Sequence, residues 1–286
     1  MPEEVSVIIP YKDAPRALSR LLSALKRQRL RPHEIIVVDS SEKHTGRALA
    51  RNHGARWFKI EPSSFNHGLT RTFAAQKSKG EVLVFFTQDA CPAHPSALSR
   101  LIGALSQKKV AAAFGRQVSP PAYGLLSFLH RLYNYPPRSR VVSAADIPRL
   151  GLRAAFFSNS FAAYRRGPLE EIGWFEEVPA LEDQLAAAKL LLAGHRLAYV
   201  ARAVVSHGHP FRVREEFRRF YRMGAFYRQY PWLLEKFGRP EGEGLRYATF
   251  IIRELKKRKA LRLWPVFLWQ QSVRLLGYKW GLCFGS

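Results

Sequence analysis

Between Val5 and Phe114, apolar and polar residues follow two different patterns. Short apolar runs are typical of buried strands, and between them apolar residues recur at helical spacing, as in the leucines from Leu18 to Leu25. An alternation of strands and helices predicts a parallel, doubly wound α/β sheet with right-handed crossovers. The expected strands lie at residues 5–10, 34–39, 56–60, 82–86 and 110–114.

The pattern becomes less regular after residue 118. Prolines and aromatic residues interrupt the stretch 119–151, where we expect an irregular connection with one helix over 125–133. Long irregular stretches inside a compact domain are usually functional or mobile. Further on we expect a strand over 156–164, a helix over 185–192 and a strand that starts at Arg196.

From Val213 the chain is basic, aromatic and helical. We therefore expect an α/β domain over residues 1–212 and a basic helical C-terminal extension over 213–286. Such helices lie on an anionic membrane surface or pack against the main domain.

The formal net charge of +24 favours a polyanionic partner: nucleic acid, an anionic membrane or a phosphorylated substrate. Arginines interleaved with aromatic residues also grip single-stranded nucleic acid. Trp264, Trp269 and Trp280 favour the membrane surface instead. A basic nucleic-acid- or membrane-binding protein without catalysis is therefore the alternative to an enzyme.

Two cysteines, Cys91 and Cys283, exclude a disulfide framework and favour a reducing cytoplasm. The opening Met-Pro-Glu-Glu lacks the features of a signal peptide, and no apolar run is long enough to span a bilayer. We expect a cytoplasmic protein, peripheral on the inner face of the cell membrane if the extension binds lipid.

Acidic residues follow two of the expected parallel strands. Asp39 and Asp89 stand at their carboxyl ends, which share one rim of the sheet and commonly carry ligand chemistry. The alternative for Asp89 is a helix cap. Glu182 and Asp183 open a helix, where two carboxylates also stabilise the helix dipole.

Sugar transfer from a nucleoside diphosphate needs a divalent cation for the leaving group and a carboxylate base for the acceptor hydroxyl. Asp89 with His207 or His209 suits the cation, and Asp183 or Glu182 suits the base. A nucleotidyltransferase is a weaker alternative, because residues 11–15 make a poor glycine-rich triphosphate loop.

An ordered set of motifs resembles the family-2 inverting glycosyltransferases, which have the GT-A fold, and from Phe65 onward their rhamnosyltransferase-like branch. Each motif alone is weak, whereas the ordered set, covering about residues 5–230, is specific. The motifs lie at residues 5–11, 35–40, 65–71, 80–90, 157–159, 182–184 and 204–209, followed by 215–217.

The resemblance implies a metal-dependent inverting transfer of a sugar, a deoxyhexose such as rhamnose, from a nucleoside diphosphate sugar. The acceptor would be a hydroxyl on a lipid-linked saccharide or a cell-surface polysaccharide, and the cofactor Mg²⁺ or Mn²⁺. Nucleic acid is not an expected partner under this interpretation.

For the nucleotide, the resemblance implies that Asp39 contacts the base together with Pro10 and Tyr11. Arg71 would also hold the nucleotide. The Asp-x-Asp motif of the family is Thr87-Gln88-Asp89 here. Thr87 thus replaces the acid usually assigned to the ribose, and the rhamnosyltransferase-like branch shares this form.

For the chemistry, the resemblance implies that Asp89 and His207 bind the metal. Asp183 would be the general base, with Glu182 supporting it or meeting the acceptor. The role of His209 stays open.

Overall fold

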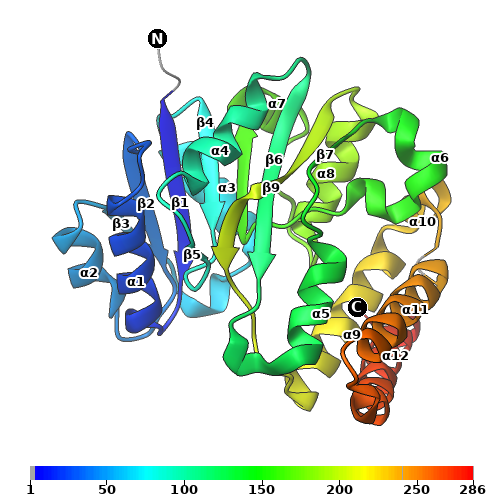
Figure 1. The fold of residues 1–286 in the computed structure, drawn as a ribbon. Helices are drawn as coiled ribbons and strands as arrows, with labels where there is room; N and C mark the ends of the chain where they lie inside the picture. Colours follow the sequence, from blue (N-terminus) through cyan, green and yellow to red (C-terminus); the bar gives the residue numbers. More distant parts are fainter. Residues whose placement is uncertain (1–3, 240, 286) are drawn as a thin grey trace.

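The computed structural model describes residues 4–239 and 241–285 (Figure 1). Residues 1–3, at the start of the chain where we expect no signal peptide, lie outside this description. The first half alternates as predicted. Its elements are β1 (Val5–Tyr11), α1 (Pro15–Lys26), β2 (Glu34–Asp39), α2 (Gly46–Asn52), β3 (Arg56–Lys59), α3 (His67–Lys77) and β4 (Val82–Phe86).

The strands form one mixed sheet in the order β3-β2-β1-β4-β8-β6-β9-β5. The remaining strands are β5 (Cys91–Pro92), β6 (Val110–Val118), β7 (Arg140–Val142), β8 (Phe161–Arg165) and β9 (Arg196–Ser206). Strands β3, β2, β1 and β4 are parallel. Strand β8 is antiparallel to both β4 and β6, so β6 runs in the same direction as β4. Because β9 is parallel to β6, strands β4, β6 and β9 all share the direction of β1.

The predicted α/β fold is confirmed, with β5, β7 and β8 running against the other strands. The strand expected over 156–164 begins only at Phe161. The preceding residues form a loop held by the Asn159 side chain, which accepts a hydrogen bond from Tyr164 Oη.

Helices complete the fold on both faces of the sheet (Figure 1). They are α4 (Ala97–Gly103), α5 (Gly124–Asn134), α6 (Ile147–Leu150), α7 (Arg166–Glu171), α8 (Glu182–Leu192), α9 (Val213–Gln229), α10 (Pro231–Phe237), α11 (Glu241–Lys257) and α12 (Trp264–Phe284). Short 3₁₀ helices lie at 62–64, 104–106, 121–123, 144–146, 151–155 and 261–263.

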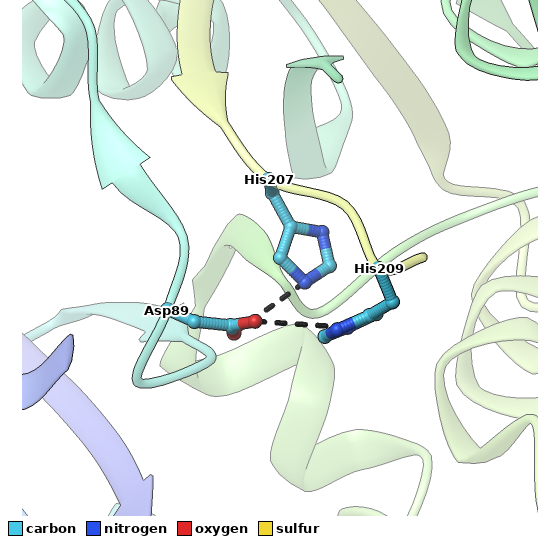
Figure 2. A group of neighbouring side chains, drawn as sticks. All are labelled: Asp89, His207 and His209. Carbon is cyan, nitrogen blue, oxygen red and sulfur yellow. Dashed lines mark ion pairs between the residues drawn. The ribbon is translucent and has the colours of Figure 1, made fainter. Parts of the chain in front are cut away.

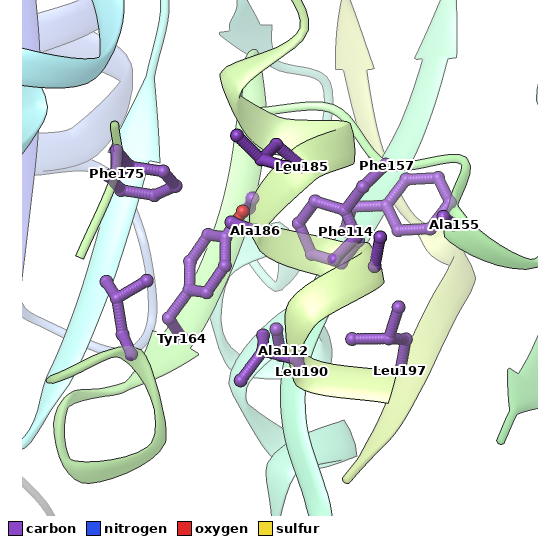
Figure 3. Close-up of a cluster of buried hydrophobic side chains, with 14 of the residues drawn as sticks. Ala112, Phe114, Ala155, Phe157, Tyr164, Phe175, Leu185, Ala186, Leu190 and Leu197 are labelled. Carbon is purple, nitrogen blue, oxygen red and sulfur yellow. The ribbon is translucent and has the colours of Figure 1, made fainter. Parts of the chain in front are cut away.

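Strand β4 is buried on both sides, as its unbroken apolar run predicts. Val84 and Phe86 belong to the core layer that contains α1 and α4. Leu83 and Phe85 belong to the opposite layer, which contains α3 and α8. Figure 3 shows part of that second layer, where Leu185 of α8 lies among aromatic side chains of the sheet (Phe114, Tyr164) and of loops (Phe157, Phe175). The end of β4 is therefore held rigidly from both faces.

The extension packs against the α/β domain. Leu129 of α5 forms a small core with Ile251 and Leu255 of α11 and Phe267 of α12. Helices α9 and α12 run parallel and approach closely through glycines: a Cβ on Gly281 would lie 1.9 Å from the carbonyl oxygen of Tyr221. None of the helices in the described ranges combines the length and hydrophobicity that a membrane span requires.

We predict that Gly281→Ala destabilises the protein, because the added methyl group would overlap the backbone of α9. The expected loss in the free energy of unfolding is about 1–3 kcal/mol, measured by urea denaturation. Gly244→Ala is the matched control, since a Cβ there meets no atom within 4 Å. Equal stability of both variants would contradict close packing of α9 on α12.

Candidate active site

Asp89, His207 and His209 converge at the rim of the sheet (Figure 2). Asp89 follows β4, and the two histidines follow β9. His207 Nε2 lies 3.5 Å from Asp89 Oδ1, and His209 Nε2 lies 3.6 Å from Asp89 Oδ2. One ligand atom from each residue lies within 4.8 Å of the others. The structure thus brings together the predicted pair, Asp89 and His207, and adds His209, whose role the sequence left open.

Hydrogen-bond directions determine which nitrogen of His207 carries its proton. Arg131 Nη1 donates to Gln117 Oε1 at 2.6 Å, and because arginine only donates, this bond fixes the orientation of the Gln117 amide. His207 Nδ1 lies 2.9 Å from the same oxygen and must therefore donate to it. In the neutral imidazole, Nε2 is then the atom with a free lone pair.

This lone pair fits a metal ligand. His207 is buried, and burial lowers the pKa of its imidazole more than the nearby Asp89 carboxylate raises it. Nε2 is itself buried and has no hydrogen-bond partner among the described residues. A neutral Nε2 and a carboxylate oxygen are both acceptors, so a cation between them would satisfy both.

The carboxyl group of Asp89 is ionised across the physiological range. Burial raises its pKa, but the neighbouring imidazoles, His207 before His209, outweigh burial and lower the pKa to about 2. A half-buried carboxylate beside two imidazoles offers oxygen and nitrogen ligands to a divalent ion.

The two residues before Asp89 have different surroundings. The Gln88 side chain accepts from Lys12 N at 2.9 Å and donates to Lys12 O at 3.1 Å, so it joins the loops after β1 and β4. The hydroxyl oxygen of Thr87 is buried without a hydrogen-bond partner in the described part of the chain. Thr87 therefore has a free polar atom at the rim, whereas the Gln88 amide is engaged by backbone.

Asp39 ends β2 and is completely buried. Its carboxylate accepts hydrogen bonds from Ser41 N and Oγ, from Gly46 N at 3.2 Å and from Trp57 Nε1 at 3.1 Å. These protein donors occupy both oxygens. In this arrangement Asp39 orders the loop between β2 and α2.

The end of β1 supports the same loop. The buried Tyr11 hydroxyl lies 2.6 Å from Thr45 Oγ1, and burial is the main cause of its raised pKa. Pro10 is half-buried beside it. Since β1, β2 and β4 are parallel, Pro10, Tyr11 and Asp39 lie on the same rim as Asp89.

A second acidic site opens α8. Leu181, the residue before the helix, has a φ of 62°, a left-handed conformation that is uncommon for a side chain of this kind. Asp183 accepts hydrogen bonds from Asn159 N at 3.1 Å and Gln184 N at 2.9 Å. Burial, followed by the charge of Glu182, raises the pKa of Asp183 to about 7. A half-buried carboxylate with this pKa can accept a proton near neutral pH.

Glu182, in contrast, is neutralised by Arg71 in a buried ion pair. Arg71 Nη1 also donates to His67 O, and Asn159 Nδ2 lies 3.4 Å from Glu182 Oε1. The structure thus places Arg71 beside Glu182, and its Nε has no hydrogen-bond partner among the described residues. Of the two neighbouring carboxylates, Glu182 has a permanent counter-ion and Asp183 has only amide donors.

The sequence argument gave no role to Gln117, Arg131 or the amide of Asn159. Gln117 lies near the carboxyl end of β6, so its place on the rim was a usable signal. Asn159 stands in the quoted motif 157–159 without an assigned partner. Arg131 gave no such signal, because it lies on α5 in the irregular stretch and its hydrogen bond to the site goes to Gln117.

Residues 6–173 match the family described as glycosyl transferase family 2. The chain belongs to this family. It is a glycosyltransferase, as the motifs imply, and the predicted GT-A architecture is that of its structural neighbours.

Two relatives from Salmonella extend the match over nearly the whole chain. One is the O-antigen chain rhamnosyltransferase RfbN of Salmonella typhimurium, 38% identical over 97% of this chain and 89% of the relative. The other is the O-antigen chain rhamnosyltransferase WbaN of Salmonella anatum, 35% identical over 98% of this chain and 90% of the relative. The glycosyltransferase is therefore rhamnosyltransferase-like in sequence.

Solved structures support the fold. The mannosyltransferase PcManGT from Pyrobaculum calidifontis, in complex with GDP-Man and Mn²⁺, superposes with a TM-score of 0.67 at 18% identity, covering 99% of this chain and 88% of that one. Residues 1–349 of TarS from S. aureus superpose with a TM-score of 0.60 at 16% identity, covering 98% of this chain and 90% of that one.

We predict that Gln117→Ala weakens binding of Mn²⁺ by the glycosyltransferase roughly 10- to 100-fold, because His207 loses the acceptor that fixes its tautomer. Titration of the free ion by electron paramagnetic resonance measures this affinity without any turnover. Gln117→Glu keeps an acceptor for His207 and Arg131 and should retain most of the affinity. Gln107→Ala, at an exposed position, is the control. Wild-type affinity for Mn²⁺ in Gln117→Ala would show that Gln117 has no role in metal binding.

Proposed function

We propose that the protein is a metal-dependent, inverting glycosyltransferase that transfers a deoxyhexose, rhamnose or a close analogue, from a nucleoside diphosphate to an acceptor hydroxyl. The acceptor is a lipid-linked saccharide or a growing cell-surface polysaccharide. The observation that carries the proposal is the pairing of two sites: a carboxylate with a pKa of about 7 on α8 and an Asp-His-His cluster on the rim. The names of the two Salmonella relatives support the choice of sugar and polymer.

In the proposed mechanism, Asp183 accepts the proton of the acceptor hydroxyl. The acceptor oxygen forms a bond to the anomeric carbon from the side opposite the diphosphate, the bond from that carbon to the diphosphate oxygen breaks, and the configuration inverts. Amide hydrogen bonds from Asn159 and Gln184 hold the Asp183 carboxylate in place.

Asp89, His207 and His209 are the residues that would hold a divalent cation. When bound, the cation neutralises charge on the departing diphosphate. Gln117 keeps the Nε2 lone pair of His207 directed toward Asp89.

The proposed nucleotide site lies along the ends of β1, β2 and β4. The free Thr87 hydroxyl would bond the ribose, taking the role of the missing acid. Pro10, Tyr11 and Asp39 would shape the pocket for the base through the loop that they order. Gln88 would act by joining two rim loops, and Arg71 by neutralising Glu182.

Sugar transfer should increase as the pH rises through about 7, because Asp183 must lose its proton before it can act as a base. Below that pH the protonated, inactive form dominates. Asp183→Asn removes the base and should lower kcat roughly 10²- to 10⁴-fold. Both effects are measured by release of nucleoside diphosphate in the presence of acceptor.

Binding of the nucleotide sugar provides the control for Asp183→Asn. Its Kd, measured calorimetrically with Mn²⁺, should stay close to the wild-type value, since Asp183 is proposed to contact the acceptor. A fully active Asp183→Asn enzyme, or a rate that falls as the pH rises through 7, would exclude Asp183 as the base.

The nucleic-acid alternative is weakened by the packing of α9. Single-stranded nucleic acid stacks on exposed aromatic side chains. Phe226 and Tyr227 are buried, and the Tyr227 hydroxyl donates to Gln184 inside the protein. These two aromatics hold the extension on the domain and are not accessible for stacking with bases.

The outer face of α12 favours an anionic membrane surface. Its exposed apolar side chains recur at helical spacing and form one stripe: Leu268, Trp269, Leu275, Leu276 and Trp280. Cationic side chains on neighbouring α9, among them Arg214 and Arg218, are also exposed. A monotopic helix of this kind inserts its apolar stripe while cations meet the lipid headgroups.

We predict that Leu275→Glu/Leu276→Glu abolishes flotation with vesicles containing phosphatidylglycerol, because two charges enter the apolar stripe. Leu69→Glu/Leu192→Glu changes two exposed leucines of the α/β domain and should float like the wild type. Binding should weaken with added salt. Equal flotation of the two variants would show that the stripe does not contact lipid.

A further inference from the structure

An open cavity of about 560 Å³, which none of Asp89, His207 and His209 lines, is bordered by α6, the 3₁₀ helix Gly151–Ala155, the start of α8, and α9 to α11. Figure 1 shows these segments gathered at one end of the sheet. Much of its wall is apolar, including Leu150, Leu152, Phe156, Met223 and Phe237. An apolar hollow of this size is large enough for a small ligand or one part of a long one.

The polar part of the same wall is mainly cationic. Arg153 and Arg246 share the single carboxylate of Glu243. Lys236 and Arg239 line the cavity, are exposed to solvent, and form no ion pair with any residue in the described ranges. The cavity wall therefore has an excess of positive charge beside its apolar part.

A second hollow of about 550 Å³ continues along α11. It shares Arg153, Glu243 and Arg246 with the first cavity and adds Leu245, Phe250 and Arg253. The cationic and apolar character therefore extends along the helix, which suits an elongated molecule better than a compact ion.

The cavity also reaches the acidic end of α8. Leu181 and Gln184 line it and stand on either side of Glu182 and Asp183 in the chain. Tyr227, another lining residue, donates a hydrogen bond to Gln184 Oε1 at 2.9 Å. The cavity wall thus includes residues next to the proposed base in the chain.

We propose that this cavity binds the lipid phosphate of the acceptor. The phosphate is held by Lys236 and Arg239, the adjoining hydrocarbon lies against the apolar wall, and the saccharide extends toward Asp183. A free phosphate would make no contact with the apolar wall, and a neutral lipid would form no ion pair with the cationic side chains. The inference rests on the proposed function for the identity of the acceptor, whereas the binding chemistry stands on the cavity itself.

Calorimetric titration with dodecyl phosphate, below its micelle concentration, tests the site without turnover. We expect saturable binding that Lys236→Glu/Arg239→Glu weakens roughly tenfold or more, since charge-assisted contacts to the phosphate are lost. Lys256→Glu/Lys257→Glu makes the same charge change at the far end of α11 and should bind like the wild type. Leu275→Glu/Leu276→Glu should also bind normally, which separates the cavity from the outer face of α12.

Two further ligands separate the possible sources of binding. Inorganic phosphate and the neutral dodecyl maltoside should each bind much more weakly than dodecyl phosphate. Binding of either one as tightly as dodecyl phosphate, or unchanged binding in Lys236→Glu/Arg239→Glu, would overturn the proposal.

Filling the cavity provides an independent test in the enzyme. Met223→Trp should raise KM for a lipid-diphosphate-linked saccharide but leave KM for the same saccharide without lipid unchanged. Leu192→Trp, on the exposed end of α8, is the control. Equal effects of Met223→Trp on both acceptors would contradict the assignment. If no saccharide accepts sugar but dodecyl phosphate still binds through Lys236 and Arg239, the proposed function fails and the cavity site stands.

Discussion

Strands β1, β2, β4, β6 and β9 run in one direction, and this constraint brings the candidate site residues to one edge of the sheet. Asp39 is the last residue of β2, Gln117 lies near the end of β6, and His207 follows β9. Asp89 follows β4, which two apolar layers hold in place. The proposed metal site, with candidate ligands this far apart in sequence, needs rigid strands of common direction, since loops alone would not keep them aligned.

Glu182 and Asp183 are neighbours in the first turn of α8, but their carboxylates have different surroundings. Glu182 faces Arg71 and forms a buried ion pair with it. Asp183 forms no ion pair and has only amide donors, so burial and the charge of Glu182 outweigh those donors and the charge of Arg71, and its pKa rises. Within the Arg71–Glu182 pair, the charge of Glu182 raises the pKa of Asp183 more than the charge of Arg71 lowers it.

The sequence predicted the order of strands and helices in the first half because apolar runs and helical spacing are local signals. It also placed Asp89 and His207 at one site, through the rim argument and the family motifs. It could not show that Asp39 is saturated by Ser41, Gly46 and Trp57, because such bonds depend on side-chain orientation. Nor could it show the direction of β8, since period-2 alternation is the same for both directions.

The C-terminal extension contributes to more than one surface. Its α10 and α11 close the cationic cavity beside α8, whereas α12 presents its apolar stripe to the outside. The glycine contacts between α9 and α12 fix these two surfaces relative to each other. If α12 lies on a membrane, the lipid phosphate moves from the headgroup layer to Lys236 and Arg239. Its saccharide can then approach Asp183. The excess positive charge of the chain then has a structural explanation, because both surfaces require cations where phosphate is met.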